Sequence, residues 1–470
     1  MQIRQLCLRA WGRSHNFGVD SVACRSGSEQ HRRAHVRCLR LSALSIICLL
    51  ALCAGGWVGR AASEETAGVT VAGAPPLGPF LDVWADAVGN HDPAVAYNSR
   101  HDEYLVVWWN NRIATRDLYA RRVAGDGTLL SSFTIVSNAN KWNWLADVVY
   151  NPVQDEYFVV YTYNNSSSDY DIWGRSIVWD GSSMGAEIQI NGEADIQWYP
   201  AVAYNSIDNE YLVVYENSWA DGRRDIAAQR IRASDGAFLS WRNIATAANT
   251  IRRLPDVAYN EARNEYLIAY TYQFNSSGDG DILGRIASHN LGTLGAEMQI
   301  VYNTACQESV ALAAGPDEYF ATWRDSGVDP NDGSKCDLKT LTIFGRRVSG
   351  NGTLNPFVTI VRENQEIHAE ADVAYSSFYG YVITWRHAST SSSHTDNVYG
   401  RNVRPQSNEI SARYDLDVGY DSQRSPTLAC TDMGQCLFVE EDNYPAADYE
   451  IRGRILQLRN VFAPIMFGGK

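Results

Sequence analysis

The sequence predicts an all-β fold, a seven-bladed β-propeller built from four-stranded antiparallel blades. A sevenfold internal repeat covers most of the 470 residues, each repeat holds four short β-type segments, and turn residues separate those segments. The central residue of the first segment recurs after 53, 54, 55, 53, 63 and 55 residues. Repeats of roughly 40–50 residues with four strands each are typical of propeller blades. One large domain therefore replaces the about three domains that the length alone would suggest.

The first two segments of each repeat are expected to be strands. The first copies are PAVAYN (93–98), ADVVYN (146–151), PAVAYN (200–205), PDVAYN (255–260), ESVALA (308–313), ADVAYS (371–376) and PTLACT (426–431). Valine and tyrosine favour strands, and the Asn that ends most copies favours a turn. The second segment, such as EYLVVW (103–108), is apolar on both faces. A strand with one solvent face would alternate, so this pattern indicates burial between neighbouring blades.

The third and fourth segments complete each blade. The third reads DLYAR, DIWGR, DIAAQR, DILGR, TIFGR, NVYGR or EIRGR, and turns such as Asp126-Gly127 and Asn351-Gly352 precede the fourth. Such dipeptides favour hairpins. A Glu opens most second segments and an Arg closes most third segments, so we expect a recurring cross-strand ion pair between them. The Gly before that Arg predicts close packing at this point.

An N-terminal strand is expected to close the ring. The seventh repeat has no clear fourth segment, whereas residues 79–98 align with residues 132–151, which hold a fourth segment followed by a first one. We therefore expect residues 80–86 to form the outer strand of the seventh blade, within a propeller that spans residues 78–458. Closure removes the exposed edges of a linear array. A β-solenoid is the alternative architecture.

Residues 1–63 are expected to be a leader that carries a secretory signal. Its apolar core, residues 41–57, follows several arginines and precedes small residues, which is the order of a cleavable export signal. An uncleaved N-terminal anchor is the alternative, because an apolar run of this length is close to the minimum for spanning a bilayer. We expect no membrane span in the mature chain, and residues 459–470 form a C-terminal tail.

The chain that follows the leader is acidic and contains four cysteines. Residues 61–470 hold 31 basic and 52 acidic side chains, a balance that disfavours nucleic acid as a partner. An even number of cysteines in an exported chain indicates disulfides. Two pairings fit the blades, although four cysteines allow three connectivities: Cys306 with Cys336, and Cys430 with Cys436.

The run PDVAYN…NEYLIAY…DILGR (255–285) resembles the repeats of secreted bacterial β-propeller proteins. The resemblance extends over about residues 80–458. It implies export and a cell-surface or extracellular role, and the group has no agreed activity. The Trp-Asp, kelch and YWTD signatures of better-characterised propellers do not occur, and Ser234-Asp235-Gly236 does not have the spacing of a sialidase Asp-box.

The loops that join second and third strands, and those that join adjacent blades, are expected to form a binding face. They are long and polar, whereas the opposite side has tight turns, and long loops on a rigid scaffold commonly carry binding sites. Aromatic platforms beside polar groups suit sugar rings, although packing between blades is the alternative role for these aromatics. The candidate ligand-binding residues are His91, Trp142, Trp144, Trp198, Tyr199, Trp219, Arg253 and Arg424.

These features favour an exported, non-catalytic module that binds an extracellular carbohydrate or protein. The first alternative is a secreted polysaccharide hydrolase or lyase, with Asp92, Asp221 or Glu370 as acid and base. Such an enzyme needs two carboxylates about 5–9 Å apart, one with a raised pKa. The second alternative is a passive structural surface protein.

The sequence contains no nucleotide-binding or other cofactor motif. Calcium is the one candidate cofactor, because Asn275, Asp279 and Asp281 could supply oxygen ligands from a single loop. A metal between His91 and His368, beside Asp92 and Glu370, would require the fold to bring the two imidazoles within about 4 Å.

Overall fold

The computed structural model describes residues 77–456, apart from 87, 112–114, 139, 167, 195, 275–279, 304, 328–340, 364–365, 390–395, 420–421 and 444–448. The described residues form 28 β-strands and no helix, which confirms the all-β prediction. Within this part of the chain there is accordingly no helix long and apolar enough to cross a membrane. The predicted leader and tail lie outside the described residues.

The strands form seven four-stranded antiparallel sets, one for each repeat. Four sheets contain four strands each, and a fifth sheet contains twelve. The twelve-stranded sheet consists of three consecutive sets joined by two parallel bridges, between Tyr170 and Ile196 and between Arg224 and Ile251.

The bounds of the strands follow the repeats. Set 1 contains β2 (Asn90–Asn98), β3 (Glu103–Asn111), β4 (Arg116–Ala124) and β5 (Leu129–Val136). Set 2 contains β6 (Asn143–Asn151), β7 (Glu156–Ser166), β8 (Asp169–Val178) and β9 (Ile188–Asn191). Set 3 contains β10 (Ile196–Asn205), β11 (Glu210–Ser218), β12 (Arg224–Arg232) and β13 (Phe238–Ala245). Set 4 contains β14 (Thr250–Asn260), β15 (Glu265–Phe274), β16 (Gly280–Ser288) and β17 (Met298–Val301).

The remaining three sets complete the described chain. Set 5 contains β18 (Gln307–Ala314), β19 (Glu318–Asp325), β20 (Thr342–Ser349) and β21 (Leu354–Val361). Set 6 contains β22 (Glu366–Ser376), β23 (Gly380–Ser389), β24 (Asp396–Val403) and β25 (Tyr414–Asp417). Set 7 contains β26 (Gln423–Cys430), β27 (Cys436–Asp442), β28 (Glu450–Leu456) and the N-terminal strand β1 (Leu77–Trp84).

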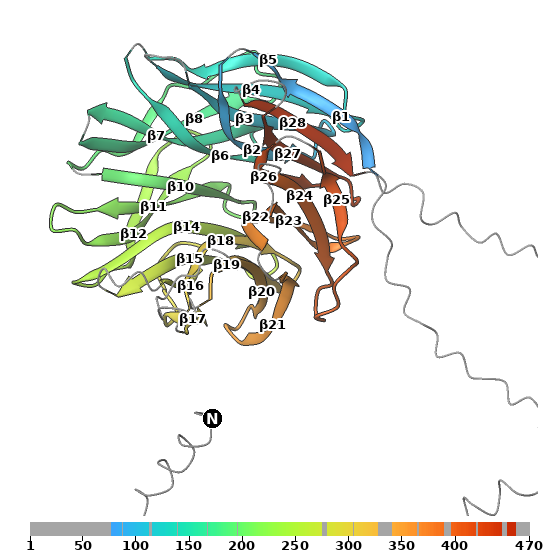
Figure 1. The fold of residues 1–470 in the computed structure, drawn as a ribbon. Helices are drawn as coiled ribbons and strands as arrows, with labels where there is room; N and C mark the ends of the chain where they lie inside the picture. The colour runs from blue at the N-terminus through green and yellow to red at the C-terminus, as the bar shows by residue number, and fades with distance from the viewer. Residues whose placement is uncertain are drawn as a thin grey trace, which may run out of the picture. The chain divides into compact units, whose positions relative to one another are not determined.

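The first strands of the sets contact one another in order. β2 contacts β6, and the contacts continue through β10, β14, β18, β22 and β26, which in turn contacts β2. Figure 1 shows β2, β18, β22 and β26 towards the middle of the fold and β5, β17, β21 and β25 towards its edge.

The N-terminal strand joins the C-terminal one, as the repeat alignment predicts. β1 pairs antiparallel with β28, for example at Leu81 and Gly453. Val83 of β1 is fully buried in a hydrophobic cluster with residues of β3 and β27. The strand begins and ends slightly before the predicted residues 80–86.

The hydrophobic core lies between neighbouring sets. Each of the seven clusters of buried side chains combines residues of two successive sets. The second strands are buried along almost their whole length, as in β27, where every residue is buried. This burial confirms the interpretation of their two-sided apolar pattern.

Two repeated residues have local structural roles. The Asn that ends the first strand accepts backbone N–H bonds from the turn that follows; Asn205 Oδ1 accepts from Ile207 and Asp208 at 3.0 and 2.9 Å. The Gly of the third strand leaves space for a neighbouring aromatic ring. A Cβ atom at Gly345 would lie 2.3 Å from Cζ of Phe320, which confirms the predicted close packing.

The repeated Arg does not form the predicted ion pair with the repeated Glu. In five sets it donates instead to a carbonyl of the outer strand in the preceding set; the donor–acceptor pairs are Arg121 with Val83, Arg175 with Ile135, Arg346 with Ile300, Arg401 with Ile360 and Arg454 with Leu416. The next residue along the strand binds the Glu in three sets: Arg122 with Glu103, Arg230 with Glu210 and Arg347 with Glu318. Side chains alternate along a strand, so the prediction was wrong by one position.

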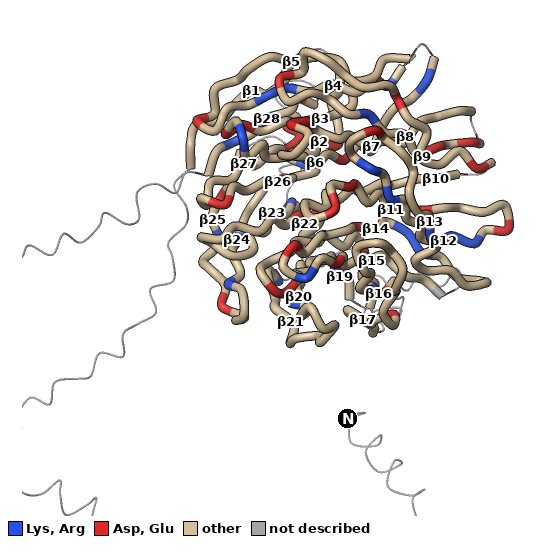
Figure 2. Tube along the Cα trace, turned by 180° about the vertical axis from the view of Figure 1, so that it is seen from behind, with Lys and Arg blue, Asp and Glu red and all other residues tan. Residues whose placement is uncertain are grey.

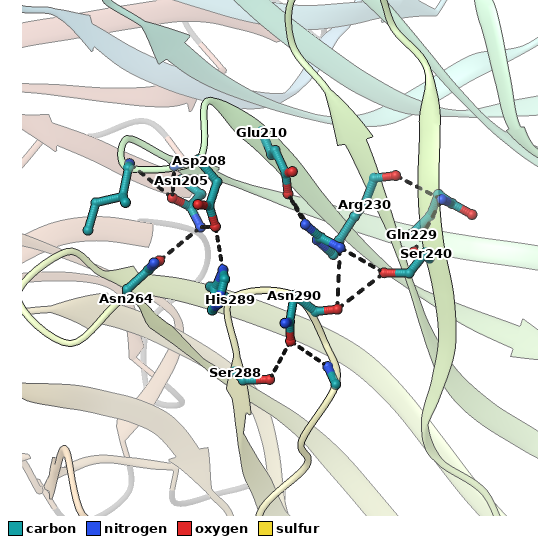
Figure 3. A network of polar contacts seen from close by, with 12 residues as sticks. Asn205, Asp208, Glu210, Gln229, Arg230, Ser240, Asn264, Ser288, His289 and Asn290 are labelled. Carbon is teal, nitrogen blue, oxygen red and sulfur yellow. Dashed lines mark hydrogen bonds and ion pairs between the residues drawn. The ribbon is translucent and has the colours of Figure 1, made fainter.

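Polar contacts also join neighbouring sets on the side of the tight turns. Figure 3 shows His289 of set 4 against Asp208 of set 3, with an Nδ1–Oδ2 distance of 2.5 Å. Arg230 reaches from Glu210 in its own set to the carbonyl of Asn290, at 3.3 Å. The turns on this side are short, and their side chains bind one another across the boundary between sets 3 and 4.

One of the two expected disulfides lies within the described residues. Cys430 and Cys436 are bonded across the hairpin between β26 and β27. Cys306 is buried, but Cys336 lies outside the described residues, so the Cys306–Cys336 pairing stays a prediction. Acidic and basic residues are interspersed along the described strands (Figure 2).

Candidate functional site

A β-bulge near the start of each first strand shapes the side on which the predicted binding face lies. All seven first strands have a register shift at this point. In all seven sets a residue with φ between 47° and 56° occupies the bulge, and the predicted site residues Asp92, Tyr199 and Glu370 are three of them. Bulges change the direction of side chains and often lie near functional sites. We call the part of the fold around the starts of the first strands the mouth.

Aromatic side chains of sets 2 and 3 form a continuous row at the mouth. The ring centroids follow one another at 5.8, 5.8, 5.6 and 5.8 Å, in the order Trp142, Trp144, Tyr170, Trp198 and Tyr199. Trp142 is exposed, and Trp144, Trp198 and Tyr199 are partly buried. The row therefore unites four of the predicted ligand residues with Tyr170, which the sequence did not single out.

Arg116 lies at one end of this row. Its Cζ atom lies 4.4 Å from the ring centroid of Trp142 and 4.3 Å from that of Trp144. A third indole, Trp109, lies 4.7 Å away on the same guanidinium. Contacts of this kind are typically worth about 0.5–2 kcal/mol each. Arg116 thus holds the tryptophans of sets 1 and 2 in a fixed arrangement.

Asp92 lies at the centre of a hydrogen-bonded group beside Trp109. The indole Nε1 of Trp109 donates to Asp92 Oδ2 at 2.8 Å, and the Asp92 backbone N–H donates to Glu441 Oε1 at 2.8 Å. His91 Nδ1 lies 3.2 Å from the second oxygen of Glu441. Burial, followed by the charge of Glu441, raises the pKa of Asp92 to about 6. The environment of Asp92 therefore favours proton exchange near neutral pH.

Glu370 belongs to a second charged group, from sets 6 and 7. Its carboxylate accepts from the backbone N–H of Ser425 at 2.8 Å and lies 2.9 Å from Arg386. Arg386 and Arg424 both bind Asp396, at 3.0 and 3.3 Å. The negative charge of Glu370 contributes to the raised pKa of Asp92, so the two predicted carboxylates interact electrostatically.

Three further predicted residues lie outside the aromatic row and outside both charged groups. Asp221 is in the β11–β12 loop, where it lies near Arg223, and Trp219 in the same loop donates to Asp225 at 2.9 Å. Arg253 forms an ion pair with Glu308. Neither Trp219 nor Asp221 takes part in the aromatic row.

The metal hypotheses have different outcomes. Asn275 and Asp279 lie outside the described residues, so the calcium loop stays a prediction. Its described member, Asp281, accepts the backbone N–H of Asn303 at 3.0 Å. The fold does not pair His91 with His368: His91 faces Glu441, whereas His368 lies beside His387.

A cavity of about 340 Å³ among the first strands is lined by three aspartates that sequence analysis did not identify as a group. Asp147, Asp256 and Asp372 occupy equivalent positions in sets 2, 4 and 6. Each accepts its own set's N–H and one from the next set; Asp256, for example, accepts from Val257 and Leu312, both at 2.7 Å. Burial raises all three pKa values, to about 6 for Asp147 and about 8 for Asp256.

We expect these aspartates to weaken the fold as the pH rises. Their folded pKa values exceed the ordinary value of 3.8, so these carboxyl groups hold more protons in the folded than in the unfolded chain, up to about pH 6 for Asp147 and about pH 8 for Asp256. Each proton held only by the folded state lowers the free energy of unfolding by about 1.4 kcal/mol per pH unit of increase. Urea unfolding at pH 5 and pH 8 should show a shallower pH dependence for Asp256→Asn than for wild type. The control Asp221→Asn changes an exposed carboxylate and should leave the dependence unaltered; equal dependences in all three proteins would contradict the assignment.

Comparison with known proteins identifies the fold but no family. No protein-family model and no curated protein matches the sequence. Among solved structures, polysaccharide lyase Uly1 is similar with a TM-score of 0.54 and 10% identity, over 80% of this chain and 91% of that one. A protein of unknown function from Dyadobacter fermentans is similar with a TM-score of 0.50 and 11% identity, over 82% of this chain and 100% of that one. The β-propeller domain of the trilobed protease from Pyrococcus furiosus has a TM-score of 0.44 at 10% identity, over 79% of this chain and 99% of that domain.

The likeness is one of fold. At 10–11% sequence identity, similarity in fold says nothing about the chemistry of a site. The candidate site therefore rests on the residues of this chain. Tyr170, Arg116, Trp109 and Glu441 belong to it although sequence analysis missed them. A signal was present for Arg116 and Tyr170, since both stand at the start of a third strand, directly after a loop that was expected to bind.

Proposed function

We propose that the chain is an exported, closed seven-bladed β-propeller that binds an extracellular carbohydrate at its mouth. The observation that carries this proposal is the aromatic row from Trp142 to Tyr199, with Arg116 at one end. Sugar rings present apolar C–H faces, which pack on aromatic rings, and hydroxyl edges, which bind charged and amide groups. Both kinds of partner are present at the mouth.

The ring itself is part of the proposal. The pairing of β1 with β28 and the unbroken series of contacts between first strands support closure. The basic and apolar pattern of residues 1–63 supports export, and a disulfide between Cys430 and Cys436 fits an oxidising compartment.

Cleavage of the bound carbohydrate is a second candidate function. It is favoured by Asp92, whose raised pKa of about 6 suits general acid–base chemistry. Glu441 and Glu370 are the carboxylates whose charges act on it. The similarity in fold to a polysaccharide lyase is compatible with this function.

A polysaccharide panel with product analysis tests both functions. The proposed binding predicts retention of at least one glycan by the wild-type chain, and cleavage predicts new reducing ends or unsaturated products. For an enzyme, Asp92→Asn should lower turnover by about 100-fold or more while the chain still binds. Binding without products would leave the non-catalytic module. Absence of glycan binding in a cooperatively folded protein would reject the carbohydrate proposal and favour a protein partner or a structural role.

A further inference from the structure

One register position distinguishes set 6 from its neighbours. Near the mouth, the first and second strands of four other sets carry directly opposed polar side chains that hydrogen-bond to each other. The bonds measure 2.8, 3.2, 2.9 and 3.3 Å for Asn90–Asn110, Gln197–Asn217, Gln307–Asp325 and Gln423–Asp442, in that order. In set 6 the opposed residues are His368 and His387.

The two histidines do not satisfy each other. Their ring centroids lie 5.0 Å apart at an angle of 43°. His368 is fully buried, and within the described part of the chain neither of its ring nitrogens has a hydrogen-bond partner. The buried Nδ1 of His387 likewise has no partner there. Burying an unpaired polar group typically costs about 1–3 kcal/mol, so a ligand that bonded to these imidazole nitrogens would stabilise set 6.

A carboxylate completes the group. Ligand atoms of Glu363, His368 and His387 all lie within 4.8 Å of one another. The Oε1 atom of Glu363 lies 3.1 Å from Arg413, while its Oε2 atom lies 4.0 Å from His387 Nε2. Arg413 therefore fixes one oxygen of Glu363 and leaves the other directed to the imidazole. Such outer contacts orient metal-binding carboxylates.

We propose that His368, His387 and Glu363 bind a Zn²⁺ ion. Two imidazoles and one carboxylate are a common three-residue ligand set for zinc, with the fourth position left to water. Tetrahedral ligands at about 2.0–2.1 Å from zinc lie about 3.3 Å apart, so the ligand atoms, which lie within 4.8 Å of one another, need to approach by at most about 1.5 Å. Glu363 is exposed, which leaves the site accessible to the ion.

The local charges agree with this ligand set. Glu366 Oε2 lies 3.3 Å from His387 Nε2, so the carboxylates of Glu363 and Glu366 together offset part of the positive charge of the ion and of Arg413. The proposal does not depend on carbohydrate binding at the aromatic row.

Zinc titration of the chelator-treated full chain, in competition with a chromogenic chelator, tests the site. The decisive variant is His368→Gln/His387→Asn, which gives set 6 the Gln–Asn pair that set 3 has at Gln197 and Asn217. We expect it to unfold cooperatively and to bind one Zn²⁺ per chain fewer than wild type. Glu363→Gln, at an exposed position where folding is not at risk, should weaken that ion's affinity by about 10–100-fold.

A matched control separates this site from other imidazoles. His101→Asn/His289→Gln removes two histidines that bind aspartates, Asp155 and Asp208, and should retain the full zinc stoichiometry. Co²⁺ in place of Zn²⁺ should give the visible absorption of a tetrahedral site in wild type and in this control only. Failure of wild type to bind zinc, or unchanged stoichiometry and affinity in the double variant and in Glu363→Gln, would overturn the proposal.

Discussion

Replacing Val83 with Asp is expected to lower the free energy of unfolding by about 4 kcal/mol or more, because a carboxylate would enter a fully apolar site. Val83 is completely buried and packs in the cluster that joins sets 7 and 1. Its carbonyl also accepts from Arg121 Nη1 at 2.9 Å. The substitution therefore removes β1 from the core while leaving the rest of each repeat intact. Urea unfolding followed by tryptophan fluorescence measures the change.

The control for this variant is Ser132→Asp, on the outer strand of set 1. Ser132 is exposed, and surface substitutions usually change stability by no more than about 0.5 kcal/mol. If Val83→Asp were as stable as Ser132→Asp, then β1 would not be an integral strand of set 7, and the closed ring in our proposal would be wrong.

Replacing Arg116 with Ala is expected to weaken carbohydrate binding by about 30-fold or more, since interface residues of this kind often contribute about 2 kcal/mol. The guanidinium lies against Trp109, Trp142 and Trp144. Without it the indoles lose the contact that fixes their relative positions, and the mouth loses a hydrogen-bond donor. Isothermal titration with the glycan retained in the panel measures the loss.

Arg223→Ala is the matched control for the arginine. Arg223 also lies over an indole, at 5.0 Å from the ring centroid of Trp219, but this pair is outside the aromatic row. Its removal should change affinity by less than about 3-fold, which corresponds to about 0.6 kcal/mol. Equal losses in both variants would mean that the row is not the binding surface.

The repeat pattern predicted most of the fold because its signals come from residues that are close together in the sequence. The apolar second segments, the turn-forming Asn residues such as Asn205 and the small Gly345 each report on local burial or local backbone geometry. The alignment of residues 79–98 with residues 132–151 likewise located β1. The repeated Arg was assigned to the wrong partner because side chains alternate along a strand; where two arginines are adjacent, as at Arg121 and Arg122, only the register shows which one faces the Glu.

The candidate site could be predicted only in part. Trp144, Trp198 and Asp92 stand out in the sequence as residues that differ between repeats; they were expected in loops between blades, whereas they lie at the starts of β6, β10 and β2. Their partners could not be found in this way, since Glu441 lies about 350 positions from Asp92 and meets it only when set 7 contacts set 1. The opposition of His368 and His387 could not be predicted either, because the bulge of β22 separates this pair from the hairpin turn and shifts the pairing with β23.

The most direct test of the central claim is to compare Trp198→Ala with Trp241→Ala in one binding measurement. Trp198 belongs to the aromatic row, whereas Trp241 is an exposed tryptophan of β13 outside it. Our account predicts that the glycan bound by wild type is bound about 30-fold or more weakly by Trp198→Ala and with unchanged affinity by Trp241→Ala. Unchanged binding by Trp198→Ala, in a protein that still unfolds cooperatively, would contradict a carbohydrate site at the mouth.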